Sequence, residues 1–496
     1  MSRPAAGLSA RIADVVAIDP GADALEFEGR WRTWGQIADT VAQVAESVGG
    51  PGVEVGVLLR NRPAPIGLLL GVLRAGGCLV TINPGRGPGR TRDDIAALDL
   101  PVLAGEPGDL AELVPAGAAA TTLAATDLGS PVLVQRATAP PIASAGPDVA
   151  VRMLTSGTTG PPKRVDLTYE TLERVLVGAK HYESSTDATL RLRRGVAVVN
   201  SPLVHLGGLF RVLQCVSDGR SFSLLERFTV EGWVDAVCRH RPATASLVPA
   251  ALRMVLEAGL DPSDLSSLRS VVSGTAPLDP DDADAFLAAY GVPVLVTYAA
   301  TEFGGSVAGW NLEDHRRFWE TKRGSVGRAH RGCELRVVDP ASGGPVAADA
   351  EGLLEVKAVQ LGSERWVRTT DLARVDADGF LWLLGRADQA IIRGGFKVRP
   401  DDVRAALERH PAVRGAAVVS RPDRRLGAVP VAAVELRPDF DGVGEGELLE
   451  HAARVLARYE LPAEIRVVDD LPRTESGKAD LAAVLALFDR QREVAG

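Results

Sequence analysis

Residues 53–82 read VEVGVLLRNRPAPIGLLLGVLRAGGCLVTI. The apolar run at each end is typical of a buried parallel strand, and the segment between them predicts a helix that ends at Gly76 and Gly77. The same alternation continues downstream, where strand-like segments precede helix-like ones at 195–216, 244–259 and 267–290. Strands that alternate with helices over roughly 300 residues predict a large α/β domain with mostly parallel sheets.

Beyond residue 325 the pattern changes. Three segments, CELRVVD, GLLEVKA and ARVDADGFLWLLGR, predict short strands joined by Gly and Asp turns, and hence a β-rich subdomain. A self-contained set of strands and helices then follows a short connection at 385–388, and the Pro/Ala/Gly-rich stretch 101–148 indicates surface loops. The expected fold class is α/β, with a large N-terminal domain (1–385), which includes the β-rich subdomain, and a small α+β C-terminal domain (389–496).

Composition excludes several classes of protein. With 46% hydrophobic and 24% charged residues among 496, the chain has the profile of a globular protein of two to four packed units. A net charge of −9 argues against a general nucleic-acid surface. No membrane span is expected, because the best apolar run, Pro65–Ile82, is interrupted by Arg74 and glycines. No secretory signal is visible and the four cysteines form no CxxC pair, so a reducing cytoplasm is the expected location.

The segment MLTSGTTGPPKRV, residues 153–165, has the composition of a phosphate loop. Its hydroxyls, glycines and ammonium can form an anion cradle from Thr155, Ser156, Gly157, Thr158, Thr159, Gly160 and Lys163. Only six of the 55 Lys and Arg residues are lysines, so a lysine in such a loop indicates that its compact ammonium matters. The loop is not a Walker A motif, which requires Gly-Lys-Ser/Thr in succession. A probable helix follows, with Thr168 as its cap.

Further motifs follow in order along the chain: SPLVHLGGL with His205, SGTAPL at 273–278, YAATE ending at Glu302, the stretch 366–403, and LPRTESGK ending at Lys478. Together with the 153–165 loop, they resemble the acyl-adenylate-forming superfamily. Its members include acyl-CoA synthetases, the adenylation domains of peptide synthetases, and luciferases. The resemblance extends from the Trp31–Trp34 region to Lys478.

This resemblance implies an ATP site. The 155–163 loop would hold the β- and γ-phosphates, Tyr298 would stack on adenine, and Asp371 with Arg386 would bind the ribose. Thr301 and Glu302 match the family's phosphate and magnesium contacts, and Glu302 is the expected metal ligand because Mg²⁺ prefers oxygen and shares its shell with phosphates. The segment after residue 273 is also expected to bind the nucleotide, through Gly274, Thr275, Ala276 and Pro277.

The resemblance also implies catalytic and mobile parts. Lys478 would bridge the substrate carboxylate and the α-phosphate, whose mutual repulsion one ammonium can offset. Residues 386–388 would form a hinge at Asp388, about which a mobile C-terminal domain rotates after adenylation. The segment RGGFK, with Gly394 and Gly395, would then line the pantetheine tunnel for CoA.

His205 has two interpretations. It matches the histidine that guards the acyl pocket in CoA-ligase branches, but it could equally be a structural residue.

Three positions depart from the family's usual glycine: Arg164 and Thr370 put the local loop geometry in doubt, whereas Ala299 favours a small acyl group. No aspartate clearly equivalent to the ammonium-binding residue of amino-acid-activating enzymes is found.

These features predict an ATP- and Mg²⁺-dependent acid–CoA ligase for a small aromatic or short aliphatic acid. The alternative is an adenylating enzyme that passes the acyl group to a carrier-protein thiol or a nitrogen nucleophile. A third hypothesis, a nucleotide-binding protein without catalysis, conflicts with the presence of Lys163, Glu302, Asp371, Arg386 and Lys478. The identity of the acid and the oligomeric state stay open at this level.

Overall fold

The computed structural model describes residues 6–115, 118–137, 145–146, 148–155, 163–178, 190–362, 365–394, 396–438, 440, 442–474 and 477–489. The chain divides into two compact units. The first consists of Met1–Ser156, Pro162–Cys333 and Ala358–Glu364, and the second of Gly157–Pro161, Glu334–Lys357 and Arg365–Gly496. The second unit thus includes the β-rich subdomain as well as the C-terminal part, and the boundary at 386–388 stays a prediction.

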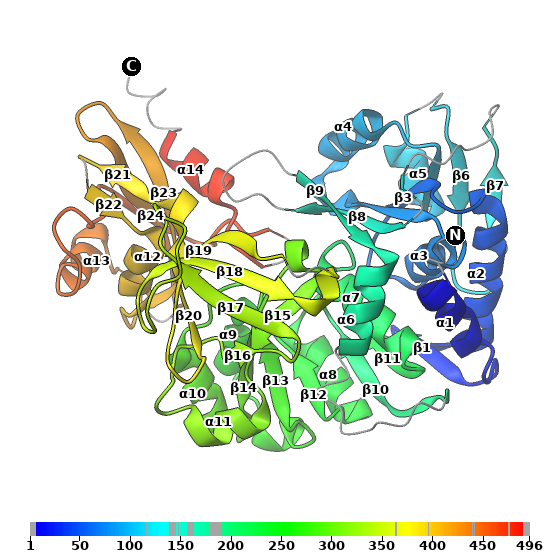
Figure 1. The fold of residues 1–496 in the computed structure, drawn as a ribbon, viewed down its shortest axis with the longest axis horizontal. Helices are drawn as coiled ribbons and strands as arrows, with labels where there is room; N and C mark the ends of the chain where they lie inside the picture. Colours follow the sequence, from blue (N-terminus) through cyan, green and yellow to red (C-terminus); the bar gives the residue numbers. More distant parts are fainter. Residues whose placement is uncertain are drawn as a thin grey trace. The chain divides into compact units, whose positions relative to one another are not determined.

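The predicted strand–helix–strand segment lies in the first unit (Figure 1). The parallel strands β3 (Glu54–Leu58) and β4 (Cys78–Ile82) are fully buried, and α3 (Pro63–Arg74) connects them. α3 contacts this sheet and also α1 (Ala6–Val16) and α2 (Trp34–Val48), so every residue of α3 except Arg74 is buried. This complete burial explains why its sequence is apolar on all sides.

These strands belong to a seven-stranded sheet of order β7-β6-β5-β3-β4-β8-β9. Its central strands are parallel, whereas β7 and β9 run antiparallel to their neighbours at the two edges. The remaining elements of this region are β5 (Val102–Gly105), β6 (Thr121–Ala124), β7 (Leu133–Gln135), β8 (Val149–Thr155), β9 (Lys163–Thr168), η1 (Pro84–Arg86), α4 (Pro88–Leu98), α5 (Pro107–Leu113) and α6 (Tyr169–Gly178).

Two further sheets complete the first unit. One has the order β10-β11-β1-β2 and joins β1 (Asp23–Phe27) and β2 (Arg30–Thr33) to β10 (Arg193–Val199) and β11 (Arg220–Leu224). The other has the order β12-β13-β14-β15-β16, with strands Thr244–Ser246, Ser270–Ser273, Val294–Ala300, Gly305–Gly309 and Arg328–Ala329. The helices are α7 (Leu206–Ser217), α8 (Val230–His240), α9 (Pro249–Glu257), α10 (Pro280–Tyr290) and α11 (Leu312–Phe318), with short turns η3 (Pro262–Leu265), η4 (Thr301–Phe303) and η5 (Val359–Leu361).

The second unit contains two sheets. The predicted β-rich subdomain is the sheet β17-β18-β19-β20, with strands Cys333–Val338, Gly352–Ala358, Val367–Val375 and Leu381–Arg386, followed by the short turn η6 (Ala387–Gln389). The other sheet has the order β22-β21-β24-β23, with β25 beside β24, and packs with three helices. Its elements are β21 (Ile391–Arg393), β22 (Phe396–Val398), α12 (Pro400–Glu408), β23 (Val413–Asp423), β24 (Gly427–Leu436), α13 (Glu445–Ala452), β25 (Ile465–Val468) and α14 (Leu481–Asp489).

Three details differ from the sequence-based expectations. The stretch 101–148 is not only loop, because β5 and β6 extend the parallel core of the seven-stranded sheet. The sequence of residues 445–459, EGELLEHAARVLARY, predicts one continuous helix, but α13 ends at Ala452, and Leu456 and Leu461 beyond it pack against the core of the C-terminal part. Lys163, at the end of the phosphate loop, begins a strand, β9, which precedes the expected helix. Thr168, the last residue of this strand, caps α6 because its hydroxyl accepts a hydrogen bond from the Thr171 N–H at 3.0 Å.

Within the described residues, no helix combines the length and the apolar character needed to cross a membrane. The same part of the chain contains no group of three or more His, Cys, Asp or Glu side chains arranged to hold a metal ion.

Candidate active site

The YAATE motif forms the end of a strand and a tight turn. Tyr298 lies on β14 with 9% of its surface exposed, and its ring is tilted against Phe303 at a centroid distance of 6.0 Å. Thr301 and Glu302 follow in η4, a single 3₁₀ turn closed by a hydrogen bond from the Gly304 N–H to the Thr301 carbonyl at 2.9 Å. Glu302 is exposed. The turn therefore presents a hydroxyl and a carboxylate directly after the aromatic residue.

The SGTAPL motif lies beside this strand. It follows β13, which pairs in parallel with β14, so both motifs occupy the carboxyl ends of neighbouring strands. A Cβ on Gly274 would lie 2.9 Å from Thr297 Cγ2, so only glycine allows this close approach. Thr275 has φ +72°, a left-handed conformation that threonine rarely adopts and that is frequent at binding sites. Thr275 and Pro277 are exposed, and Ala276 is half-buried.

Three polar side chains form a hydrogen-bonded chain next to Tyr298. The Thr297 and Ser306 hydroxyls are 2.5 Å apart, and Ser306 Oγ is 2.8 Å from His330 Nε2. Ser306 also donates to the Tyr298 carbonyl at 3.2 Å. This cluster is not predictable from the motifs, since nothing in the sequence indicates that residues 306 and 330 meet.

The phosphate loop begins and ends at paired strands. Thr155, the last residue of β8, is the register partner of Lys163, the first residue of β9. Lys163 is exposed. The other predicted loop residues, Ser156, Gly157, Thr158, Thr159 and Gly160, lie outside the described residues.

Arg164, which departs from the family's glycine, has defined partners. Its guanidinium donates to both carboxylate oxygens of Asp94 on α4, at 2.9 and 2.8 Å, and to the Thr81 carbonyl at 3.1 Å. Both side chains are mostly buried, with 15% and 21% exposed. The arginine thus attaches β9 to α4 and to the end of β4.

His205 lies at the amino end of α7 and is half-buried. Its carbonyl accepts the first helical hydrogen bond, from the Leu209 N–H at 3.1 Å. This position is compatible with a pocket residue and with a structural one.

The predicted ribose-binding residues lie in the second unit. Asp371 on β19 and Arg386 on β20 are register partners. Arg386 donates to both carboxylate oxygens of Asp388, each at 3.0 Å, and to the Thr370 hydroxyl at 2.5 Å. Thr370, the second departure from glycine, therefore supplies an oxygen that holds this guanidinium.

Lys478 lies in a tight turn of the second unit and is half-buried. Its carbonyl accepts from the Thr474 N–H at 2.7 Å and from the Thr474 hydroxyl at 3.2 Å. Gly477, with φ +79°, provides the left-handed residue that the turn requires. An isolated bridge between Arg473 and Ala479 closes the base of the turn.

The predicted CoA segment forms a hairpin of β21 and β22, in which Arg393 and Phe396 are paired. Gly394 has φ +58° and donates its N–H to the Leu426 carbonyl at 2.7 Å, whereas Gly395 lies outside the described residues. The Phe396 ring stacks on Tyr459 at 4.7 Å and is 57% exposed.

The predicted site residues thus fall into two sets. The first unit holds Thr155, Lys163, His205, Tyr298, Thr301 and Glu302, and the second holds Asp371, Arg386, Gly394 and Lys478. An exposed carboxylate such as Glu302 fits a Mg²⁺ that takes its other ligands from phosphates and water.

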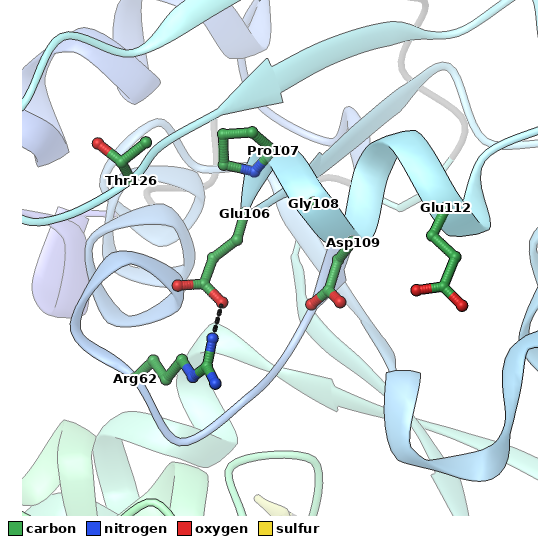
Figure 2. Close-up of a pocket in the computed structure, with 7 residues that line it drawn as sticks. All are labelled: Arg62, Glu106, Pro107, Gly108, Asp109, Glu112 and Thr126. Atoms are coloured by element: carbon green, nitrogen blue, oxygen red, sulfur yellow. Dashed lines mark hydrogen bonds and ion pairs between the residues drawn. The ribbon is translucent and has the colours of Figure 1, made fainter.

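A pocket of about 400 Å³ contains none of these residues. It lies at the carboxyl ends of β3 and β5 and is lined by Arg62, Glu106, Pro107, Gly108, Asp109, Glu112 and Thr126 (Figure 2). Burial raises the pKa of Glu106, which pairs with Arg62 at 3.1 Å, and Asp109 pairs with Arg60 at 2.7 Å. These ion pairs link the loops that follow the two strands.

Comparisons with known proteins cover both units. Residues 12–364 match the model of the AMP-binding enzyme family, and residues 402–478 match that of the AMP-binding enzyme C-terminal domain. The indoleacetate–CoA ligase of Aromatoleum aromaticum is 29% identical over 96% of this chain and 96% of its own length. The amide bond synthetase McbA of Marinactinospora thermotolerans is 27% identical, with a TM-score of 0.79 over 98% of this chain and 100% of that one. ATP-bound MatB of Rhodopseudomonas palustris, 24% identical, shares the fold with a TM-score of 0.80 over 97% and 98% of the two chains.

Proposed function

The chain belongs to the AMP-binding enzyme family, within its adenylate-forming CoA ligases, and on this premise we propose that it joins a small carboxylic acid to CoA in two steps. In the first step, a carboxylate oxygen attacks the α-phosphorus of ATP, and pyrophosphate leaves. In the second, the CoA thiol attacks the acyl carbon, loses its proton, and displaces AMP.

The first step would use residues from several of the motifs. Tyr298 would stack on adenine, and the Thr301–Glu302 turn would contact the phosphates, where the exposed Glu302 carboxylate would hold Mg²⁺. The cation neutralises phosphate charge when it is bound. Asp371 accepts from the ribose hydroxyls, and Lys163 binds the β- and γ-phosphates. Lys478 offsets the repulsion between the attacking carboxylate and the α-phosphate.

The observation that carries this proposal is the geometry of the Lys478 turn. Backbone hydrogen bonds, and Gly477 in a left-handed conformation, hold Lys478 next to the isolated bridge that Arg473 forms with Ala479. The backbone from which the Lys478 side chain extends is thus held in one conformation, which favours electrostatic stabilisation of the transition state by its ammonium.

For the second step, the C-terminal part would rotate about Asp388 and bring the Gly394–Gly395 segment to the acyl-adenylate. Glycine at these two positions leaves room for a pantetheine chain. For the acid, Ala299 supports a small aromatic or short aliphatic group. The first relative named above, an indoleacetate–CoA ligase, acts on an acid of that size class. The four free cysteines are consistent with a reducing, cytoplasmic location.

One experiment tests the proposal. A panel of acids, from acetate and benzoate to palmitate, is incubated with MgATP, and pyrophosphate release is measured with and without CoA. We expect the best acid to be a small aromatic or short aliphatic one, and CoA to increase turnover. Palmitate exceeding such acids tenfold in kcat/KM would contradict the size assignment.

A second candidate acceptor is a nitrogen nucleophile. The likeness to the amide bond synthetase McbA over nearly the whole of both chains favours it. The same assay with added amines in place of CoA separates the two acceptors. If acyl-adenylate forms, CoA has no effect and an amine restores turnover, the second candidate replaces the first.

A further inference from the structure

We propose that Glu435 is a positioning residue that holds the Lys478 turn in its adenylating geometry. Glu435 lies on β24 and is 3% exposed. The inference rests on the proposed function, since it gives Lys478 a catalytic role. It concerns a residue that belongs to none of the sequence motifs.

The Glu435 carboxylate contacts Leu471 and Arg473, two residues that precede the Lys478 turn. Its Oε2 accepts from the Leu471 N–H at 3.2 Å and from Arg473 Nη2 at 3.3 Å. Its Oε1 accepts from Arg414 Nη1 at 2.8 Å. One buried anion thus binds two points of the chain just before Lys478.

Backbone pairing connects Arg473, which Glu435 holds, to the immediate neighbour of Lys478. Arg473 is bridged to Ala479, the neighbour of Lys478, and the Asp480 N–H donates to the Pro472 carbonyl at 2.8 Å. Residues 472–473 and 479–480 are therefore joined to each other, and Glu435 holds this junction through Arg473. A shift of Arg473 would displace the backbone of Lys478 directly.

The opposite strand leaves room for this arrangement. Gly415 on β23 is the register partner of Glu435, and a Cβ there would lie 3.2 Å from Arg473 Nη2 and 3.2 Å from Leu471 Cδ1. A side chain at position 415 would push these two side-chain atoms aside by a few tenths of an ångström, so glycine leaves the space that Arg473 and Leu471 occupy. The Arg473 guanidinium occupies the space beside it.

The apolar contacts of the region do not require a carboxylate. Leu471, which is 5% exposed, packs in a core with Ala433, Val484 and Phe488. Placing a carboxylate among such residues is unfavourable unless its hydrogen bonds are satisfied. An apolar residue at position 435 would pack as well in this core. Only a side chain with a hydrogen-bond acceptor can bind both the Leu471 N–H and the Arg473 guanidinium.

The decisive variant is Glu435→Gln, which keeps the shape and removes the charge. We expect adenylation, measured by pyrophosphate exchange, to lose about ten- to thirtyfold in kcat with the KM for ATP within twofold. Thioester formation from synthetic acyl-adenylate should stay within twofold, because Lys478 is not used in that step. Arg473→Met, which changes a residue one-third exposed, should give the same asymmetry if Glu435→Gln folds poorly.

The matched control is Glu464→Gln. Glu464 is also a carboxylate held by two arginines of the C-terminal part, Arg421 and Arg466, but it makes none of the contacts to residues 471–480 given above. It should leave both half-reactions within twofold. A second readout needs no activity: amine-reactive labelling of Lys478, followed by peptide mass spectrometry, should be faster in Glu435→Gln than in wild type or Glu464→Gln.

Two results would overturn the inference: equal loss of both half-reactions, or unchanged adenylation together with unchanged Lys478 labelling. If wild type catalyses no exchange with any acid, the proposed function fails, and the labelling rates alone decide whether Glu435 holds the turn.

Discussion

Asp371 and Arg386 lie directly opposite each other in the antiparallel pair of β19 and β20, and Arg386 is bound to Asp388 by two hydrogen bonds. The residues implied in ribose binding and the residue implied as the hinge therefore belong to one network. Thr370 completes it by accepting from the same guanidinium. Movement about Asp388 must then alter the contacts of Arg386.

The first prediction concerns Thr370. Thr370→Val should raise the KM for ATP about three- to fivefold, with kcat little changed, because Arg386, whose side chain is 37% exposed, loses one hydrogen-bond acceptor. Steady-state kinetics with varied ATP measure this. Thr370→Ser retains the hydroxyl and should behave as wild type. If the valine and serine variants had equal KM values for ATP, Thr370 would not support Arg386 in nucleotide binding.

The second prediction concerns Lys478. Lys478→Ala should slow adenylation by about two to three decades, which corresponds to about 3–4 kcal/mol of transition-state stabilisation. Thioester formation from synthetic acyl-adenylate should be nearly intact. Lys322→Ala, at another of the six lysines, is the control and should not affect either half-reaction. If both half-reactions of Lys478→Ala fell equally, the domain-alternation mechanism would be wrong.

The third prediction separates hinge motion from charge. Asp388→Pro fixes φ near −65° and also removes the ion pair with Arg386. Asp388→Ala removes the ion pair alone. We expect the proline variant, but not the alanine variant, to change the ratio of the two half-reactions by more than tenfold. Pyrophosphate exchange and thioester formation, measured on both variants, test this, and equal ratios would exclude a hinge at this residue.

The fourth prediction concerns acid stability. Glu26 on β1 is 2% exposed; burial opposes its charge, but hydrogen bonds from Arg239, Ser223 and His240 hold its pKa below the usual value of 4.5. Its contribution to stability is therefore present above pH 4.5 and is lost as the pH falls through the lower, folded-state pKa. Glu26→Gln should cost about 1–3 kcal/mol at neutral pH, because Arg239 and His240 lose an ionised partner. The midpoint of thermal unfolding, measured from pH 7 to pH 3, should fall less steeply in the variant than in wild type.

Much of the fold follows from local sequence. The segment 53–82 forms the predicted strand, helix and strand, because its Val-, Leu- and Ile-rich runs can be satisfied only by complete burial. In the C-terminal part, alternate residues of β23 face two different cores, with Ala416 and Val418 on one side and Ala417 and Val419 on the other. An apolar run of this kind indicates a strand covered on both faces.

The differences from the expected fold have a common physical origin. Residues 101–148 contain many Pro, Ala and Gly, yet β5 and β6 are placed there by pairing with β3, a contact between segments far apart in the sequence. The helix at 445–459 ends early because Leu456 and Leu461 contact the core from the following turn. Tertiary contacts determine both the strands within 101–148 and the early end of this helix, and local composition gives no information about such contacts.

The same limit applies to the site. Motifs identified the residues implied to contact substrates, such as Tyr298 and Lys478, because their spacing along the chain is a local property. The supporting residues were missed. Glu435 is a single carboxylate in an apolar strand, and its partners at 414, 471 and 473 become apparent only when β23, β24 and the turn are assembled.

The pairing of β8 with β9 has a consequence for how the chain could be divided. A break between Thr155 and Lys163 would leave β8 in one fragment and its partner β9 in the other. The sheet β10-β11-β1-β2 would also be shared, since β1 and β2 precede the break and β10 and β11 follow it. Each fragment thus supplies strands that the other needs. Two polypeptides, 1–156 and 162–496, expressed together should therefore assemble into one particle without a covalent link at the phosphate loop.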